Sequence, residues 1–156
     1  MNNLIDLYQE IIVDHGRNPR NFASLSAPTH IHEGYNPLCG DRLIVYFHEE
    51  DGVIEEVCFE GSGCVISMAS ASLMTEMLKG KLIQEVENLF SQFHNLVTGK
   101  NSDDINRLGK LSVLASVSAF PMRVKCVTLC WHTALAALRN KKKEAVGGPN
   151  DGNPCY

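Results

Sequence analysis

The distribution of hydrophobic and polar residues predicts that the chain starts with a helix. The apolar residues recur there at helical spacing, with acidic residues between them. They are Leu4, Tyr8, Ile11 and Ile12. Gly16 and Pro19 are expected to end this helix, and residues 17–28 are expected to form a polar loop.

The next part of the chain has a pattern typical of strands. Residues 43–48 and 53–60 are rich in β-branched and aromatic side chains. Asp51-Gly52 lies between these two runs and is a strong signal for a hairpin turn. A further short extended segment is expected at residues 30–34. The predicted β-structure is therefore a hairpin preceded by one short extended segment.

Helical periodicity returns in the rest of the chain. Helices are predicted over residues 67–79, 82–97 and roughly 126–143, and residues 105–118 are expected to be partly helical. Residues 147–156 are dense in glycine, proline and asparagine. They predict a flexible tail that follows a single domain of residues 1–146.

Composition supports this organisation and excludes several classes of protein. The 156 residues (17.2 kDa) fit one ordinary domain, and 44% hydrophobic with 21% charged residues is globular composition. A formal net charge of −4 argues against a nucleic-acid partner, because nucleic-acid-binding domains usually carry a basic excess. No apolar run approaches membrane-spanning length, and the start has no secretory signal pattern. We therefore expect a cytoplasmic protein with no membrane association.

Six cysteines require a chemical explanation, since thiols in a reducing compartment are usually metal ligands, nucleophiles or buried small groups. Cys39 lies in a turn before a predicted strand, Cys64 follows Gly61-Ser62-Gly63, and Cys126 lies at the expected start of the last helix. Their wide separation matches no compact zinc-finger pair. The junction positions are more informative, because glycines let the backbone bend toward a shared point and a helix N-terminus lowers the pKa of a thiol.

Asp41 lies two residues beyond Cys39, so both side chains could reach one ion from a single turn. Three thiolates and one carboxylate would give tetrahedral coordination suited to zinc or iron. The alternative is that Asp41 is a turn residue bonded to its own backbone. The sequence pattern leaves both interpretations open.

Four motifs then occur in an order that resembles a known family. They are residues 7–15 (LYQEIIVDH) with Asn18-Pro19, residues 36–41 (NPLCGD), residues 59–64 (FEGSGC) with the Ser/Ala-rich run after them, and residues 123–126 (RVKC). On these motifs the chain resembles, from residue 4 to about 138, the U-type iron–sulfur cluster assembly proteins. This is the IscU/SufU family, which is related to the NifU N-terminal domain.

The resemblance implies a fold, a site and a partner. The fold is α+β, with a small three-stranded antiparallel sheet packed against several helices. The metal site is carried over to Cys39, Asp41, Cys64 and Cys126. The partner is a pyridoxal-phosphate-dependent cysteine desulfurase of the SufS type, which supplies persulfide sulfur.

Departures from the housekeeping IscU pattern favour the SufU-type branch. Lys125 stands immediately before Cys126, where IscU scaffolds have histidine, and residues 120–125 read FPMRVK in place of a Leu-Pro-Pro-Val-Lys chaperone-binding segment. Residues 97–115 look like the insertion typical of SufU proteins. These differences argue against a dedicated chaperone partner and against a labile cluster built on this protein.

The predicted function is zinc-dependent sulfur transfer in iron–sulfur cluster assembly. By resemblance to SufU, Cys39 is the sulfur acceptor: a side chain of the desulfurase replaces it on zinc, and the freed thiolate attacks the persulfide. Arg123 and Lys125 are expected to balance the negative charge of the site. Sulfur would pass to apo iron–sulfur proteins or to a downstream SUF scaffold.

Three other functions are weighed against this one. The protein could instead be a non-enzymatic scaffold on which a transient [2Fe–2S] cluster is assembled with the same ligands. A zinc hydrolase with Asp41 as base is disfavoured, because the chain has no His-x-Glu or His-Glu-x-x-His pattern. The last alternative is a purely structural zinc domain.

The remaining cysteines and histidines are given structural interpretations. Cys58 is predicted to be a buried strand residue, and Cys130 a core residue rather than a spare thiol near the metal. Cys155 lies in the expected tail, and His94 and His132 lie in apolar helical stretches where hydrogen-bonded partners are more common than metal ligands.

Overall fold

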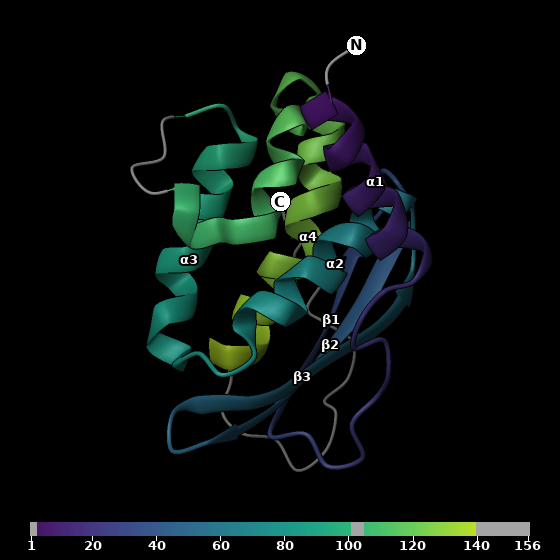
Figure 1. Cartoon of the computed structure of the whole chain (residues 1–156). Coiled ribbons are helices and arrows are strands. Elements are labelled where there is room, and N and C mark those ends of the chain that lie inside the picture. The colour runs from purple at the N-terminus through teal and green to yellow at the C-terminus, as the bar shows by residue number, and fades with distance from the viewer. Residues whose placement is uncertain (1–2, 101–104, 140–156) are drawn as a thin grey trace.

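The computed structural model describes residues 3–100 and 105–139 and contains an α+β fold, as predicted (Figure 1). In chain order the elements are α1 (Asn3–Arg17), β1 (His30–Asn36), β2 (Asp41–Glu50), β3 (Val53–Ser62), α2 (Val65–Leu78), α3 (Ile83–Val97), the 3₁₀ helix η1 (Ile105–Ala119) and α4 (Pro121–Arg139). The three strands form one antiparallel sheet in the order β1-β2-β3. The weakly signalled segment at residues 30–34 is therefore a full strand.

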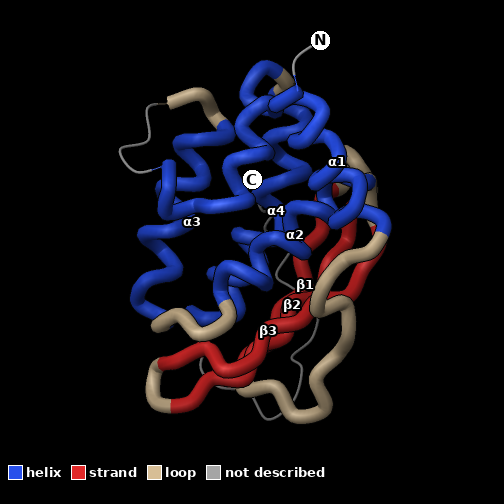
Figure 2. The backbone as a smooth tube through the Cα atoms, viewed as in Figure 1, coloured by secondary structure: helices blue, strands red, loops and turns tan. Residues whose placement is uncertain are grey.

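The helices lie on one side of the sheet, so the molecule has a helical layer and a sheet layer (Figure 2). Helix α4 packs on β1 and β2, α2 packs on β3 and on α4, and α1 packs on α2. Helix α3 contacts mainly η1, and its first residue, Ile83, donates its N–H to the carbonyl of Gly52 in the β2–β3 turn (2.9 Å). Helices α2 and α4 make the most extensive contacts between the helical layer and the sheet.

The core lies between these two layers. Alternate residues of β2 face the helices and are fully buried, namely Leu43, Val45 and Phe47. Trp131 of α4 is also fully buried and stacks on Phe93 of α3, with ring centroids 5.3 Å apart. Burying this much apolar surface is the main source of stability for a domain of this size.

The β2–β3 hairpin confirms the turn predicted from sequence. Glu50 pairs with Val53, so Asp51 and Gly52 form a two-residue loop. Both have positive φ, 52° for Asp51 and 81° for Gly52. Two central residues with positive φ match the right-handed twist of the flanking strands.

The last helix differs from the prediction at its N-terminus. It begins at Pro121, five residues before Cys126, so Cys126 lies inside the helix rather than at its start. Proline is favoured at the first helical position, because its fixed φ suits a helix and its missing N–H has no intrahelical partner there. The first helix also runs past Gly16 to Arg17.

Some predictions fall on residues outside the described ranges. They are the tail at residues 147–156 with Cys155, and the end of the last helix at residues 140–143. The domain boundary at residue 146 therefore stays a prediction. Within the described residues, no helix combines the length and apolar character needed to cross a membrane.

Candidate metal centre

The β1–β2 turn positions Cys39. Its anchor is Asn36, which is fully buried and accepts a hydrogen bond from the Leu38 N–H at its side-chain oxygen (3.1 Å). The side-chain amide of Asn36 also donates to Cys39 Sγ (3.5 Å). Gly40 follows with φ +73°, a conformation that other residues rarely adopt. Cys39 is exposed at this turn.

Asp41 begins β2 and is fully buried. Its Oδ1 accepts a hydrogen bond from the backbone N–H of Cys64 (3.0 Å), and its Oδ2 lies 3.9 Å from Cys64 Sγ. Gly63 allows this approach, since a Cβ there would lie 2.5 Å from Asp41 Oδ1. Asp41 thus accepts its hydrogen bond from the N-cap residue of α2 rather than from its own turn, which favours a site residue over a turn residue.

Cys64 is the residue that caps the N-terminus of α2. Its φ and ψ are −71° and 162°, and its Sγ accepts a hydrogen bond from the Ser67 N–H (3.4 Å). Cys64 therefore lies at a strand-to-helix junction, as predicted, with its sulfur at the positive end of the helix dipole.

Cys126 lies in the second turn of α4 and is 1% exposed. Its Sγ is 3.2 Å from Cys39 Sγ, although 87 residues separate the two cysteines along the chain. Burial raises the pKa of the Cys126 thiol, and the hydrogen bond with Cys39 and the nearby Cys64 and Asp41 raise it further. The expectation that a helix N-terminus lowers this pKa is therefore wrong. The thiol lies beyond the first turn of α4 and is buried in the interior of the protein.

These side chains converge on one point. Ligand atoms of Cys39, Asp41 and Cys126 all lie within 4.8 Å of one another, and Cys64 Sγ borders this group beside Asp41. Three sulfurs and one carboxylate are a donor set that zinc accepts in tetrahedral geometry. Without a cation, burial favours the neutral Cys126 thiol, and a bound cation would favour the thiolate. The structure thus brings three of the predicted residues into one donor group and places Cys64 beside Asp41 at its edge.

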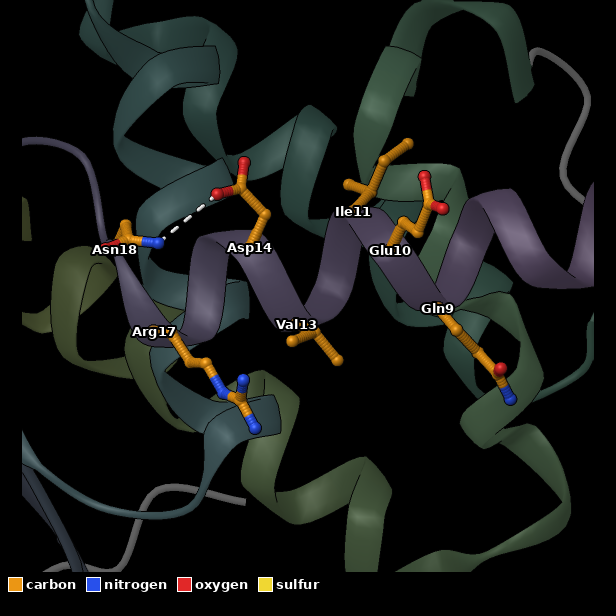
Figure 3. A pocket seen from close by; sticks show the side chains of 7 residues that line it. All are labelled: Gln9, Glu10, Ile11, Val13, Asp14, Arg17 and Asn18. Atoms are coloured by element: carbon orange, nitrogen blue, oxygen red, sulfur yellow. Dashed lines mark hydrogen bonds between the residues drawn. The ribbon is translucent and has the colours of Figure 1, made fainter.

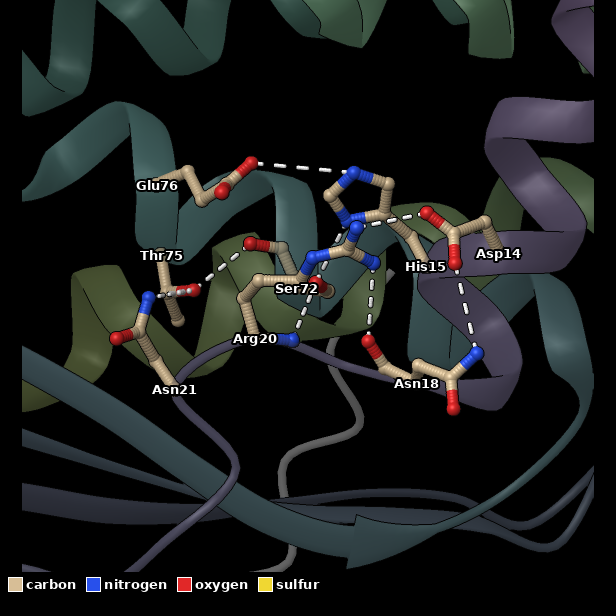
Figure 4. A network of polar contacts seen from close by, with 8 residues as sticks. All are labelled: Asp14, His15, Asn18, Arg20, Asn21, Ser72, Thr75 and Glu76. Atoms are coloured by element: carbon tan, nitrogen blue, oxygen red, sulfur yellow. Dashed lines mark hydrogen bonds and ion pairs between the residues drawn. The ribbon is translucent and has the colours of Figure 1, made fainter.

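A polar network ties the region around α1 to α2, the helix that Cys64 caps (Figure 4). His15 is 2% exposed, and its Nδ1 lies 2.8 Å from Ser72 Oγ, which also accepts the backbone N–H of Arg20 (2.9 Å). Burial lowers the pKa of His15, and the charge of Arg20 lowers it further. Arg20 in turn pairs with Asp14 at 2.7 Å. This network gives residues of the first motif a structural role in holding α2.

A broad hollow of about 840 Å³ contains none of the predicted ligand residues (Figure 3). Its described lining comes from α1 and the residue just after it, and consists of Gln9, Glu10, Ile11, Val13, Asp14, Arg17 and Asn18. It has no thiol and no histidine among these residues, so it offers no alternative centre for the predicted sulfur chemistry.

The structural interpretations of Cys58 and Cys130 are confirmed. Cys58 is 7% exposed in β3, and burial raises the pKa of its thiol. Cys130 is fully buried in the core cluster, and its contacts are with Ser70 Oγ (3.5 Å) and the Val127 carbonyl (3.6 Å). Burial raises the pKa of Cys130 to about 12, so this thiol is protonated at neutral pH.

The structure differs from the prediction at His132. Its buried Nε2 has no hydrogen-bond partner within the described part of the chain, and its ring packs edge-on against Phe90 with centroids 5.0 Å apart. Burial lowers the pKa of His132 to about 4, so the ring is neutral.

Sequence reasoning also missed the role of Asn36 in holding Cys39. The signal was its position in the NPLCGD motif, three residues before Cys39.

The comparison with protein families agrees with the geometry. A family model described as "NifU-like N terminal domain" matches residues 7–127, which is most of the chain. The chain belongs to this family. "Zinc-dependent sulfurtransferase SufU" of Bacillus subtilis is 43% identical over 129 residues, covering 83% of this chain and 87% of that protein. "Iron-sulfur cluster assembly scaffold protein IscU" of Thermotoga maritima is 38% identical over 133 residues, covering 85% and 93%.

Solved structures of family members have the same fold. An iron–sulfur cluster assembly scaffold protein for the SUF system from Fervidobacterium islandicum has a TM-score of 0.80 and 35% identity, covering 89% of this chain and all of that one. A nitrogen-fixing NifU-like protein from Brucella abortus has a TM-score of 0.78 at 19% identity, a likeness of fold alone. The resemblance drawn from the four motifs and the α+β fold are therefore confirmed.

Proposed function

We propose that this protein works in iron–sulfur cluster assembly by accepting persulfide sulfur from a cysteine desulfurase, with zinc held by Cys39, Asp41, Cys64 and Cys126. The observation that supports this proposal is the group formed by Cys39, Asp41 and Cys126, in which Cys39 is exposed. Cys64 lies at the edge of this group, beside Asp41. The SufU name of the Bacillus subtilis relative supports zinc-dependent sulfur transfer as the activity.

Cys39 is the proposed sulfur acceptor. Its turn is exposed, whereas Cys126 is 1% exposed, so a partner's persulfide reaches Cys39 first. The Cys39 thiolate attacks the outer sulfur of the persulfide, and the sulfur–sulfur bond of the donor breaks. The donor cysteine leaves as a thiolate, the proton stays on the transferred sulfur, and Cys39 becomes the persulfide.

Zinc, when bound, would keep its thiol ligands ionised at neutral pH without adding redox chemistry. The protein's own residues would set which thiol reacts. Asn36 and Gly40 shape the turn that carries Cys39, while Asp41 and Cys64 are linked by the Asp41–Cys64 hydrogen bond. Cys39 is therefore the donor best placed to leave the site and return to it.

The partners follow from this chemistry. The donor is a pyridoxal-phosphate-dependent cysteine desulfurase of the SufS type, and the recipients are apo iron–sulfur proteins or a downstream SUF scaffold.

A second candidate function is a scaffold for a transient [2Fe–2S] cluster. It is favoured by the IscU name of the Thermotoga maritima relative and by the same donor set. Anaerobic reconstitution with iron and sulfide, followed by visible absorption and metal analysis, distinguishes the two functions. The site of action is expected to be the cytoplasm.

A test of the acceptor compares Cys39→Ser with Cys64→Ser, two variants that each remove one proposed zinc ligand. Zinc-loaded protein is incubated with a SufS-type desulfurase and cysteine, and the sulfur is located by peptide mass spectrometry. We expect the added sulfur on Cys39 in the unsubstituted chain and its loss in Cys39→Ser, with some uptake kept in Cys64→Ser. Undiminished uptake by Cys39→Ser would exclude Cys39 as the acceptor.

A further inference from the structure

We infer that Cys126 is the resolving thiol of this site: it releases the sulfur accepted by Cys39 as sulfide and forms a Cys39–Cys126 disulfide. This inference rests on the proposed sulfur uptake by Cys39. It adds a second step after sulfur uptake, in which a residue of this chain releases the transferred sulfur.

The distance between the two sulfurs is the first argument. Cys39 Sγ and Cys126 Sγ are 3.2 Å apart, and a disulfide bond is about 2.0 Å long. The two sulfurs are therefore in contact, and bond formation has about 1.2 Å left to close. Cys39 lies on a turn beside Gly40, so its side of the pair is the one able to adjust.

The opposite exposure of the two thiols is the second argument. Attack on a disulfide-like sulfur proceeds in line, with the nucleophile opposite the leaving sulfur. Cys39 is exposed and receives sulfur from outside, whereas Cys126 is 1% exposed and approaches Cys39 from the protein interior. A sulfur accepted from outside would therefore lie on the side of Cys39 Sγ opposite Cys126, which is the arrangement that expels the outer sulfur.

The step is balanced. A bond forms between Cys126 Sγ and Cys39 Sγ, and the bond between Cys39 Sγ and the outer sulfur breaks. The two cysteine sulfurs are oxidised to a disulfide, and the outer sulfur is reduced to sulfide. Burial favours the protonated form of Cys126, so its proton passes to the departing sulfur as the new bond forms. With the proton of the persulfide it leaves as hydrogen sulfide, and no external oxidant is needed.

The other thiols of the described chain are less suited to this step. Cys64 Sγ is 3.9 Å from Asp41 Oδ2 and falls outside the tightest donor group. Cys130 is one turn beyond Cys126 but contacts Ser70 and Val127 in the core. A Cys39–Cys126 disulfide would also withdraw two of the four proposed zinc donors, so sulfide release and metal binding would exclude each other at this site.

The experiment uses the full chain, stripped of metal by a chelator and freed of reductant. It is mixed with an equimolar amount of glutathione persulfide, quenched at intervals, and analysed for sulfide, intact mass and cross-linked peptides. We expect transient gain of one sulfur atom on Cys39, then release of sulfide together with a peptide that joins Cys39 to Cys126. In Cys126→Ser the Cys39 persulfide should persist roughly tenfold longer or more, because the neighbouring nucleophile is gone.

Cys130→Ser is the matched control, since it removes a thiol one helical turn away, and it should release sulfide as the unsubstituted chain does. The cross-linked peptide is detected in the unsubstituted chain, so this measurement does not depend on whether any variant folds. Equal sulfide release by Cys126→Ser, or sulfur accumulating on Cys126 without a disulfide, would overturn the inference. No sulfur on Cys39 in Cys126→Ser, where no neighbouring thiol removes it, would instead count against Cys39 as the acceptor.

Discussion

At the scale of single residues, Asp41 combines a structural contact with a charge in the candidate site. It is fully buried, and one oxygen of its carboxylate is committed to the Cys64 N–H at 3.0 Å. The other oxygen faces the sulfur of Cys64. Asp41 therefore has two separable properties: it accepts a hydrogen bond from the N-cap residue of α2, and its charge can bind a cation.

Asp41→Asn is expected to separate these properties. Asparagine keeps an acceptor for the Cys64 N–H, so the free energy of unfolding of the metal-free chain should stay within about 1 kcal/mol. Zinc affinity should fall by at least about tenfold, because an anionic donor becomes a neutral amide. Chemical denaturation and competition with a zinc chelator measure the two effects.

Two further variants are the controls for this prediction. Asp41→Ala removes the acceptor as well and should cost about 1–3 kcal/mol, since it leaves the Cys64 N–H without a partner. Asp51→Asn, in the β2–β3 turn, should change neither quantity. Unchanged zinc affinity in Asp41→Asn would show that the carboxylate is not a ligand.

At the scale of elements, the contact between β1 and α4 is what brings Cys39 and Cys126 together. The turn with Cys39 follows β1 directly, and Cys126 lies in α4. The two elements approach closely at Gly34, since a Cβ there would lie 1.9 Å from Thr133 Oγ1. The missing side chain of Gly34 thus sets the spacing between the strand and the helix that carry the two thiols.

Gly34→Ala is expected to lower the free energy of unfolding by about 1–3 kcal/mol, because an added methyl group overpacks a closed interface. Adding Thr133→Ala removes the nearest atom and should restore part of the loss in the double variant. Denaturant unfolding of both single variants and the double variant gives the coupling. A purely additive result would show that the two residues do not limit the β1–α4 spacing.

At the scale of the whole molecule, the core is independent of the metal centre. The buried cluster extends from the sheet through α2, α3 and η1 to α4, and includes Phe47, Leu89, Leu114 and Trp131. A hydrophobic core of this extent supports a folded metal-free chain, unlike the small zinc fingers that unfold without metal. Zinc should therefore add to stability without being required for the fold.

Zinc removal is expected to lower Tm while leaving the far-ultraviolet circular dichroism spectrum largely unchanged. At a free zinc concentration about 100 times Kd, binding stabilises the folded state by about 2.7 kcal/mol. For a chain of this length that corresponds to a Tm shift of about 5–10 °C. Thermal unfolding with zinc and with a chelator measures the shift. Loss of helical signal on chelation would show that the fold depends on the metal.

The sequence predicted most elements because their signals are local. The Asp51-Gly52 turn and the strands on either side follow from neighbouring residues, and the structure has them as expected. The start of α4 was predicted five residues too late, since proline before a helix reads equally well as a loop residue or as the first residue of the helix. His132 Nε2 also lacks the expected partner among the described residues, and its ring packs on Phe90, a contact with no local signal.

The sequence by itself determined the family and the four candidate donors, because a motif is defined by which residues occur and in what order. Only the tertiary structure decided that these donors meet, that Asp41 bonds to Cys64, and that Cys126 is buried beside an exposed Cys39. The physical reason is that burial and sulfur–sulfur distance depend on how β1, β2, α2 and α4 pack, and no short stretch of sequence contains that information.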